Sequence, residues 1–338
     1  MTGQDQSFGV TSAETGAAVE PAGEDAVLPY SVDALDVRGR VVYLGSALDA
    51  ILRRHAYPEP VSRLLGEAIV LTALLGSSLK FKGRLILQTQ TDGPVSMLVV
   101  DFQAPGNIRA YARFDEERLE AAVQNDAADT PGLLGKGHLA MTIDQGTYMQ
   151  RYQGLVVLDG GSFEDVAHRY FEQSEQIPTR VRLAVGEMLT RHEGQEPDQV
   201  WKAGGIVAQF LPENTERMRM KDFDPGDVPD GIVYQEHAED DAWIEAKALV
   251  DTVEDVELTA PEMNAERLLF RLFHERDPRV FPPQQVADKC RCTRDSVSQM
   301  LENFQVEERM EMVVDNQIEV TCEFCSAQYQ FDPKDFDT

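Results

Sequence analysis

All four cysteines of the chain lie in its last 49 residues, and no other feature of the sequence constrains the fold as strongly. They form two close pairs, Cys290-Arg-Cys292 and Cys322-Glu-Phe-Cys325, with 29 residues between the pairs. Two close pairs around a folded insert are typical of a tetrahedral site in which four thiolates hold one Zn²⁺ ion. The sequence therefore predicts a small C-terminal unit with Cys290, Cys292, Cys322 and Cys325 as its metal ligands, one ion per chain.

The insert between the pairs has the pattern of a small folded unit. Thr293 can cap a helix, and residues 313–320 predict a hairpin that turns at Asp315-Asn316. A unit of roughly 50–60 residues has little apolar core, and structural zinc contributes on the order of 10–16 kcal/mol in small peptide sites. Losing the metal is therefore expected to unfold this unit.

The same cysteines allow other interpretations. A constitutive zinc ribbon would be inert to oxidants, and four free buried thiols would bind no metal. Lys289, Arg291 and Arg294 form a basic patch that would favour thiolate at Cys290 and Cys292. Within each pair the sulfurs are close enough to form a disulfide once the metal is lost. These features support redox sensitivity, and they leave redox regulation open.

Before the cysteines, residues 25–212 predict one α+β domain, in which hairpin strands lie beside a few helices. Apolar spacing predicts helices over residues 47–55, 62–80 and 163–173, the last of them capped by Ser162. Alternating side chains predict strands over residues 84–90 and 108–114, and an apolar run predicts one over residues 96–102. Further strands are expected over residues 138–144, 151–158, 179–185 and 206–211. The first three of these strands form a meander, because turn signals separate them.

An acidic helical linker is expected over residues 213–280, before a zinc unit over residues 281–338. From Glu236 to Glu266 the chain has eleven acidic residues and one basic residue. Thr259 with Glu262 predicts a capping box for a helix that ends near residue 274. A segment with so few apolar side chains is marginal alone and depends on docking to its neighbours.

The first 24 residues predict a disordered extension, because they are rich in Gly, Ala, Ser, Thr and Glu. They contain neither the positive start nor the apolar run of a secretory signal, so the chain is expected in the cytoplasm. In that reducing compartment, clustered cysteines more often bind metal or carry redox chemistry than form a disulfide framework.

The excess of acidic residues limits the kinds of partner that the chain is expected to bind. The 338 residues include 59 Asp and Glu against 31 Lys and Arg, which gives a formal charge of −28. Phosphates would be repelled over most of such a surface, so a general nucleic-acid binder is disfavoured. No stretch approaches the ~20 apolar residues of a membrane span, so no membrane partner is expected.

Several stretches give the chain a family resemblance. They are Tyr57-Pro58, LLGEA at 64–68, Leu79-Lys80, GRLILQTQTDGP at 83–94, LLGKG at 133–137, RYQG at 151–154, YFEQSEQIPT at 170–179, AGG at 203–205, and the two cysteine pairs. Together they resemble the redox-regulated heat-shock chaperonin of the thirty-three-kilodalton class, a bacterial holdase family. YFEQSEQIPT and the paired CRC and CEFC are specific, whereas an isolated AGG is not.

The resemblance implies an ATP-independent chaperone rather than an enzyme. It implies that the reduced, zinc-bound protein is an inactive monomer whose metastable helical linker packs on the N-terminal domain. It also implies that oxidants form the disulfides Cys290–Cys292 and Cys322–Cys325, release zinc, unfold the small domain and loosen the linker. The exposed surface then holds unfolding client proteins, often as a homodimer.

This sequence departs from the family pattern in two places. The hairpin turn of the zinc unit commonly carries Gly in the family and is Asp315-Asn316 here, and the N-terminal extension lies outside the pattern. Two alternative functions stay open: a constitutive zinc-ribbon adaptor or nucleic-acid-binding module, and a thiol–disulfide oxidoreductase that uses Cys322 and Cys325. Neither cysteine pair opens a βαβ pattern of the thioredoxin kind.

The remaining motifs are assigned structural roles. The histidines at positions 55, 138, 168, 192, 237 and 274 are scattered, and four cysteines already complete a tetrahedral shell, so no histidine is assigned to the metal. Ser174-Glu175-Gln176 and Tyr152-Gln153-Gly154 contain no pairing of base and nucleophile. They are expected to pack and fix the fold.

Overall fold

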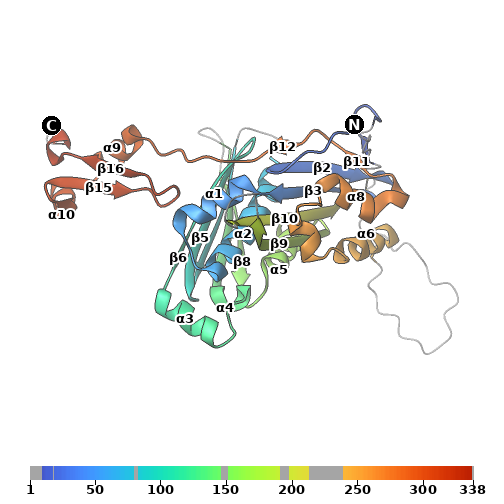
Figure 1. The fold of residues 1–338 in the computed structure, drawn as a ribbon, viewed down its shortest axis with the longest axis horizontal. Helices are drawn as coiled ribbons and strands as arrows, with labels where there is room; N and C mark the ends of the chain where they lie inside the picture. The colour runs from blue at the N-terminus through green and yellow to red at the C-terminus, as the bar shows by residue number, and fades with distance from the viewer. Residues whose placement is uncertain are drawn as a thin grey trace.

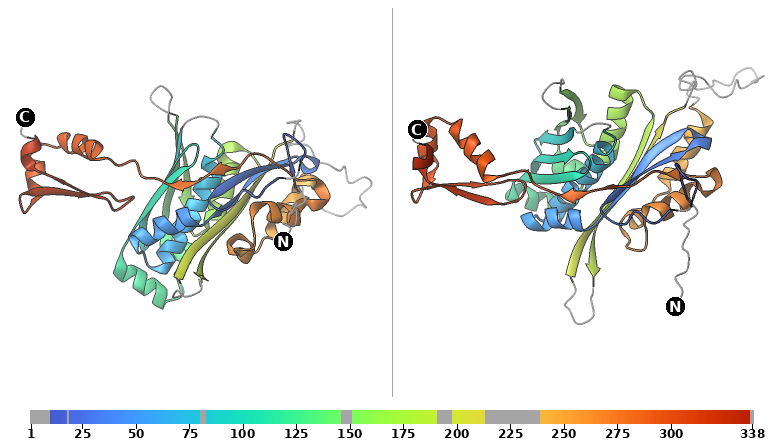
Figure 2. Two further views of the ribbon diagram at one scale, coloured as in Figure 1. Left: turned by 45° about the horizontal axis from the view of Figure 1, so that its top comes forward. Right: turned by 90° about the horizontal axis from the view of Figure 1, so that it is seen from above.

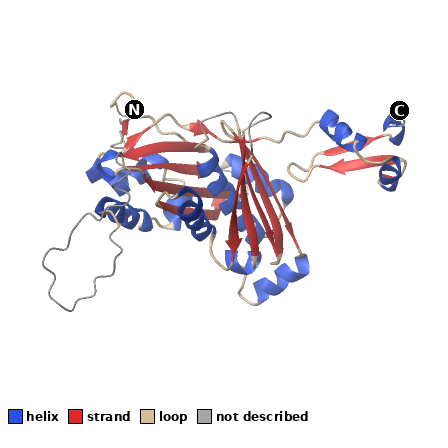
Figure 3. Cartoon of the chain, turned by 180° about the vertical axis from the view of Figure 1, so that it is seen from behind, coloured by secondary structure: helices blue, strands red, loops and turns tan. Residues whose placement is uncertain are grey.

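A computed structural model describes residues 10–17, 19–79, 83–145, 151–190, 198–212 and 239–336. Two β-sheets lie side by side in the main body, and a third, three-stranded sheet forms a separate hairpin unit at the C-terminal end (Figures 1 and 3). The mixed α+β class, the helical linker and the small C-terminal unit are confirmed. No helix in the described part of the chain combines the length and apolarity that crossing a bilayer requires.

The six-stranded sheet contains the predicted meander. Its strands, in spatial order, are β13 (Ala287–Asp288), β6 (Asn107–Phe114), β5 (Val95–Gln103), β4 (Arg84–Thr91), β7 (Gly137–Asp144) and β8 (Tyr152–Leu158). In β4, alternate residues such as Leu85 and Leu87 are buried, as the period of two predicts. The short helices α3 (Glu116–Gln124) and α4 (Thr130–Leu134) follow β6 in the chain.

The seven-stranded sheet brings distant segments together. Its strands are β1 (Thr11–Ser12), β11 (Arg279–Val280), β2 (Ala26–Val32), β3 (Val37–Leu44), β10 (Asp198–Phe210) and β9 (Thr179–Thr190), with β12 (Gln284–Gln285) also paired to β2. Strands β9 and β10 extend beyond the predicted 179–185 and 206–211. Their outer halves carry polar residues and glycine, and antiparallel pairing as far as Asp198 with Thr190 continues both strands there.

Helix α2 (Glu59–Gly76) fills the space between the two sheets, and its residues 61–76 are buried almost all round. It begins before the predicted residue 62, because Pro60 is tolerated in a first helical turn. The preceding helix α1 (Ser46–His55) begins after Gly45, which has no capping side chain. Instead, Asp25 Oδ1 accepts the N–H groups of Gly45 and Ala47.

Glu67 on α2 is largely buried, and burial raises its pKa to about 7, although a hydrogen bond from Thr130 Oγ1 opposes the shift. Because the folded state keeps a proton that the unfolded chain releases above about pH 4.5, the free energy of unfolding is expected to fall as pH rises from 4.5 to 7. The slope for this one group is at most about 1.4 kcal/mol per pH unit.

Urea unfolding of Glu67→Gln across that pH range checks this slope. The variant should lose the contribution and be more stable than the parent at pH 8. Glu59→Gln, at an exposed position of the same helix, should keep the parent slope. Identical slopes for all three proteins would contradict the assignment.

The linker helices α6 (Asp241–Asp251), α7 (Asp255–Thr259) and α8 (Ala265–Phe273) cover the outer face of the seven-stranded sheet (Figure 1). The predicted capping box at Thr259 is wrong, since Thr259 is the last residue of α7. Asn264 caps α8 by accepting the N–H of Arg267, and Pro261 lies between the two helices. Residues 213–238, the expected start of the linker, lie outside the described residues.

Other short elements complete the main body. They are helix α5 (Phe163–Tyr170), the π-helical turn η2 (Phe171–Glu175), and the 3₁₀ turns η1 (Asp33–Leu35) and η3 (His274–Arg276). Ser162 caps α5 in a capping box with Asp165, as predicted. The helical segment keeps its cap and then changes to a π turn, so the predicted end near residue 173 falls inside η2.

The N-terminal extension is not disordered over its described part, which corrects the expectation for residues 10–17 and 19–24. Val10 is buried in the core under the linker helices, and β1 pairs with β11. The N–H of Ala22 donates to the buried carboxylate of Glu266 on α8, with 2.7 Å between N and Oε1. Composition did not reveal this packing, because few apolar side chains carry it.

Replacing Val10 with Asp should therefore destabilise the docked extension. Burying a valine side chain contributes about 2 kcal/mol, so we expect a loss of that size in the free energy of unfolding, measured by urea denaturation. Hydrogen exchange at the Ala22 amide should become faster as well. Glu14→Gln, an exposed change in the same segment, is the control, and equal stability of the two variants would contradict the packing.

An extended strap, residues 279–289, joins the linker to the C-terminal unit. Its strands β11 and β12 pair with β2, and β13 pairs with β6 of the other sheet. The N–H of Lys289 then donates to the carbonyl of Ile108. The boundary predicted at residue 281 is corrected, because strand pairing holds the strap to the main body until just before Cys290 (Figure 2).

The C-terminal unit matches the predicted helix and hairpin and adds further elements. It contains α9 (Arg294–Glu302), α10 (Val306–Glu311), β14 (Val313–Val314), β15 (Gln317–Thr321), β16 (Gln328–Phe331) and the turn η4 (Pro333–Phe336). Thr293 caps α9, and Asp315 and Asn316 both adopt positive φ in the turn, as Asn and Asp tolerate. The buried core of the unit is small, consisting of Val297, Leu301, Ile318, Phe331 and Phe336.

Candidate metal centre

The fold brings all four cysteines together. Cys290 and Cys292 follow the strap, whereas Cys322 and Cys325 lie in the turn between β15 and β16. All four Sγ atoms lie within 4.8 Å of one another. The two sulfur contacts that are resolved run across the sequence pairs, at 3.8 Å for Cys290 with Cys322 and 3.2 Å for Cys292 with Cys325. All four cysteines are free thiols.

Local backbone geometry shapes the second cysteine pair. The N–H of Cys322 donates to the carbonyl of Ala327, and the N–H of Ser326 donates back to the carbonyl of Cys322. Ser326 adopts a positive φ of 56° to close this turn. The backbone therefore folds tightly around the loop and turns both of its sulfurs toward Cys290 and Cys292.

The donor set fits one soft divalent metal ion. Zinc–sulfur bonds of about 2.3 Å in a tetrahedron separate neighbouring sulfurs by about 3.8 Å, which is the scale of this cluster. Within the described residues, these cysteines are the one group of His, Cys, Asp and Glu side chains close enough to hold an ion. His192 and His237 lie outside the described residues.

The cation that contacts a sulfur is not one that the sequence singled out. Arg109 on β6 places Nη1 3.5 Å from Cys290 Sγ. Of the predicted basic patch, Arg291 pairs instead with Asp101 at 2.6 Å, and the Arg294 guanidinium lies over the Phe331 ring. Nothing in the sequence links position 109 to position 290, because only strand pairing brings them together.

The sulfurs differ in acidity. Burial opposes ionisation of Cys290, but the Cys292 N–H and the Arg109 guanidinium outweigh it and lower the pKa of this thiol to about 6. Burial raises the pKa of Cys322 and of Cys325. The Tyr329 hydroxyl donates to Cys292 Sγ at 3.2 Å. Cys290 therefore ionises more readily than Cys322 or Cys325, and thiolates are the form that reacts with oxidants.

The Cys322–Cys325 loop also contacts the main body through Glu323 and Phe324. Arg113 on β6 donates to Glu323 Oε1 from Nε at 2.8 Å and from Nη2 at 2.6 Å. The Phe324 ring meets Tyr111 edge to face, with 4.8 Å between centroids, and lies 3.9 Å from the Arg109 guanidinium. The cysteine cluster is thus directly coupled to β6.

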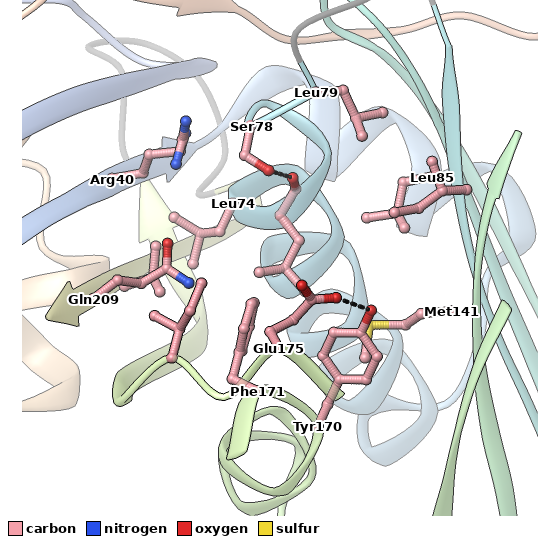
Figure 4. A pocket seen from close by; sticks show the side chains of 14 residues that line it. Arg40, Leu74, Ser78, Leu79, Leu85, Met141, Tyr170, Phe171, Glu175 and Gln209 are labelled. Atoms are coloured by element: carbon pink, nitrogen blue, oxygen red, sulfur yellow. Dashed lines mark hydrogen bonds between the residues drawn. The ribbon is translucent and has the colours of Figure 1, made fainter. Parts of the chain in front are cut away.

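The YFEQSEQIPT stretch lies far from the sulfurs. Its residues Tyr170, Phe171, Glu175 and Ile177 line a cavity of about 240 Å³ between the sheets, together with Arg40 from β3 (Figure 4). The Tyr170 hydroxyl donates to Glu175 Oε1 at 3.2 Å. Gly154 of RYQG packs so closely under the Tyr170 ring that no Cβ would fit. The tyrosine of YFEQSEQIPT therefore requires the glycine of RYQG.

Comparisons with known proteins agree on one family. The model of the Hsp33 protein family matches residues 25–332. A 33 kDa chaperonin of Caulobacter vibrioides is 44% identical over 314 residues, covering 92% of this chain and 95% of the relative. A 33 kDa chaperonin of Pseudoalteromonas translucida is 34% identical over 313 residues, covering 92% and 97%. The crystal structure of a 33 kDa chaperonin, the heat shock protein 33 homolog from Thermotoga maritima, aligns with this chain with a TM-score of 0.68. The alignment covers 93% of this chain and 97% of that chain at 20% sequence identity, so the two share a fold.

Proposed function

The chain belongs to the Hsp33 protein family, whose members are chaperones, and from that premise we propose that it is a redox-regulated, ATP-independent holdase. The observation that carries this proposal is the position of the cysteine cluster. Four sulfurs lie within 4.8 Å of one another at one end of a unit whose buried core consists of only five side chains, so an ion shared by the sulfurs would hold that unit together. An event at the sulfurs therefore decides whether that unit is folded.

Cys290, Cys292, Cys322 and Cys325 would hold one Zn²⁺ ion, which when bound would link two distant segments and add folding free energy. On oxidation, the four thiolates give up four electrons and form two disulfides. Two molecules of hydrogen peroxide accept these electrons and, with four protons, become four molecules of water. We assign the disulfides Cys290–Cys292 and Cys322–Cys325 from the family resemblance. Sulfurs bonded in this way no longer hold the ion.

The linker responds because the strap connects it to the cluster. Helices α6 to α8 pack through Trp243, Leu268 and Phe273 onto the seven-stranded sheet, while most of their acidic side chains, though not Glu266, are at least partly exposed. Gly204 of β10 touches the carbonyl of Leu258 so closely that α7 can dock only over a glycine. When the C-terminal unit unfolds, the strap loses its anchor beyond Cys290, its pairing beside the linker weakens, and repulsion among the exposed acidic residues of the linker favours release. The apolar faces of the helices and of the sheet then become available to unfolding proteins.

The same proposal also specifies the binding partners of the chain and its location in the cell. The partners are unfolding client proteins, and the −28 charge disfavours nucleic acid. We propose a cytoplasmic protein that is monomeric when reduced and dimeric when oxidised. Thiol-disulfide turnover is not part of this function, so the chain is proposed not to be an enzyme.

A peroxide titration at mildly elevated temperature tests the proposal. We expect one zinc released as four thiols disappear, together with strong suppression of the aggregation of an unfolding test protein. The reduced chain should suppress little. Equal activity in both states, or retention of zinc through complete thiol oxidation, would exclude the switch, and salt-dependent retention on DNA with zinc kept under oxidant would favour the zinc-ribbon adaptor or nucleic-acid-binding module.

A further inference from the structure

The Cys322–Cys325 loop occupies a cationic and aromatic surface of the main body, which we call the cradle. The cradle consists of six side chains from the end of α1, the residues just after it, and β6: Arg54, His55, Tyr57, Arg109, Tyr111 and Arg113. His55 stacks on Tyr57 with 4.9 Å between ring centroids. Arg54 also pairs with Asp288 of the strap and Arg109 with Asp101 of β5, whereas Arg113 pairs with Glu323 of the loop.

Three kinds of contact hold the loop in the cradle. The Phe324 ring lies between the Tyr111 ring and the Arg109 guanidinium. The Phe324 carbonyl accepts a hydrogen bond from Arg54 Nη1 at 3.4 Å and lies 3.2 Å from His55 Nε2. Arg113 clamps the Glu323 carboxylate through two nitrogens. The cradle thus contacts an aromatic ring, the main-chain carbonyl of the same residue and the carboxylate of the residue before it. These are the groups by which a peptide segment can be recognised.

The cradle and its occupant depend on different parts of the fold. Glu323 and Phe324 lie between two cysteines of the cluster, so they keep their shape only while the C-terminal unit is folded. Cradle residues Tyr57 and Tyr111 belong to the main body, where the Tyr57 hydroxyl bonds both the N–H and the carbonyl of Ala112. Unfolding of the C-terminal unit would therefore empty the cradle without dismantling it.

We propose that the emptied cradle docks client segments in which an aromatic residue directly follows an acidic one, and that Glu323-Phe324 is an internal mimic of such a segment. This inference rests on the proposed function, because it names the chemistry of the clients. Over most of this acidic surface an acidic segment is repelled, whereas at the cradle Arg113 attracts its carboxylate. The aromatic ring adds the apolar contact with Tyr111 and Arg109.

A labelled peptide tests the proposal on the full-length chain. The probe has the sequence of residues 321–329 with serine in place of both cysteines, and its binding is followed by fluorescence anisotropy. We expect the reduced double variant Glu323→Gln/Phe324→Ala, with its zinc content verified, to bind the peptide at least tenfold more tightly than the reduced parent. The oxidised parent should bind as the reduced variant does.

Matched control variants and peptides distinguish specific recognition from nonspecific binding. Adding Arg113→Gln to the double variant should weaken binding about tenfold, and this exposed side chain can be changed without disturbing the core. Arg151→Gln, an exposed arginine at the opposite edge of the same sheet, should change nothing. Peptides with lysine for the acidic residue, or alanine for the aromatic one, should lose most of the affinity.

Two results would overturn the proposal: no gain in binding by the zinc-loaded double variant, or equal binding of the lysine peptide. Neither depends on the redox switch, because the decisive comparison uses reduced protein. Failure of the proposed function would appear separately, as absence of aggregation suppression by the oxidised parent.

Discussion

Cys292→Ser is expected to abolish stoichiometric zinc binding and to unfold residues 290–336 of the reduced chain. A hydroxyl is a poor substitute for a thiolate, so one substitution leaves three ligands. The five buried side chains of the unit contribute roughly 1.5–3 kcal/mol each before the entropy of ordering the chain is subtracted. Together that is about 7.5–15 kcal/mol, which the entropy of ordering the chain offsets, so the folded unit depends on a metal site worth on the order of 10–16 kcal/mol.

Zinc analysis and hydrogen exchange measure this effect together. The parent should carry one ion and protect amides of β15 and β16, and the variant should show neither. Glu302→Gln, an exposed change on α9, should match the parent. If Cys292→Ser retained a full equivalent of zinc and a protected hairpin, the four-sulfur site would be wrong.

Phe273→Ala is the second large effect, because it should activate the chain without oxidant. Phe273 is fully buried on α8 and stacks on Tyr30 of β2, with 5.9 Å between ring centroids. Removing a buried phenylalanine side chain typically costs 3–5 kcal/mol, so the undocked linker should become at least about a hundredfold more populated. The reduced variant is expected to suppress aggregation while its zinc remains bound.

Phe270→Ala is the matched control, since Phe270 lies on the same helix but is 43% exposed. It should leave the reduced chain inactive and remove little stability. Limited trypsin digestion should show faster cleavage within residues 239–276 for Phe273→Ala alone. An inactive, zinc-bound Phe273→Ala with a trypsin-sensitive linker would separate linker release from activity and would contradict the proposed mechanism.

The six-stranded sheet was predictable from the sequence because its strands alternate and its turns carry strong signals. Strand β4 follows the period of two, and Asp92-Gly93 marks the next turn. The ends of β9 and β10 were not predictable, because backbone pairing rather than side-chain pattern extends them. The cap of α8 was misplaced for a related reason: two residues with capping potential, Thr259 and Asn264, lie close together, and packing decides between them.

The clustering of the four cysteines could be predicted, and the residues around the cluster could not. Spacing within the sequence predicted the cluster that the fold assembles. The contact of Arg109 with Cys290 and the docking of Phe324 join residues about 180 and 215 positions apart, and no local pattern marks either contact. The ordered N-terminal extension was missed likewise, because a single buried residue, Val10, anchors its beginning.

The strap along both sheets bears on how the protein recovers. Because the strands that pair with the strap, β2 and β6, belong to the main body, the strap can pair with them again before the parts on either side of it refold. Cys290 and the end of α8 then remain within a few residues of their final positions. When reductant returns, both elements reassemble at a high effective concentration instead of searching from an open coil. The tether would make the resting state quick to restore, so the protein could pass through many cycles of stress.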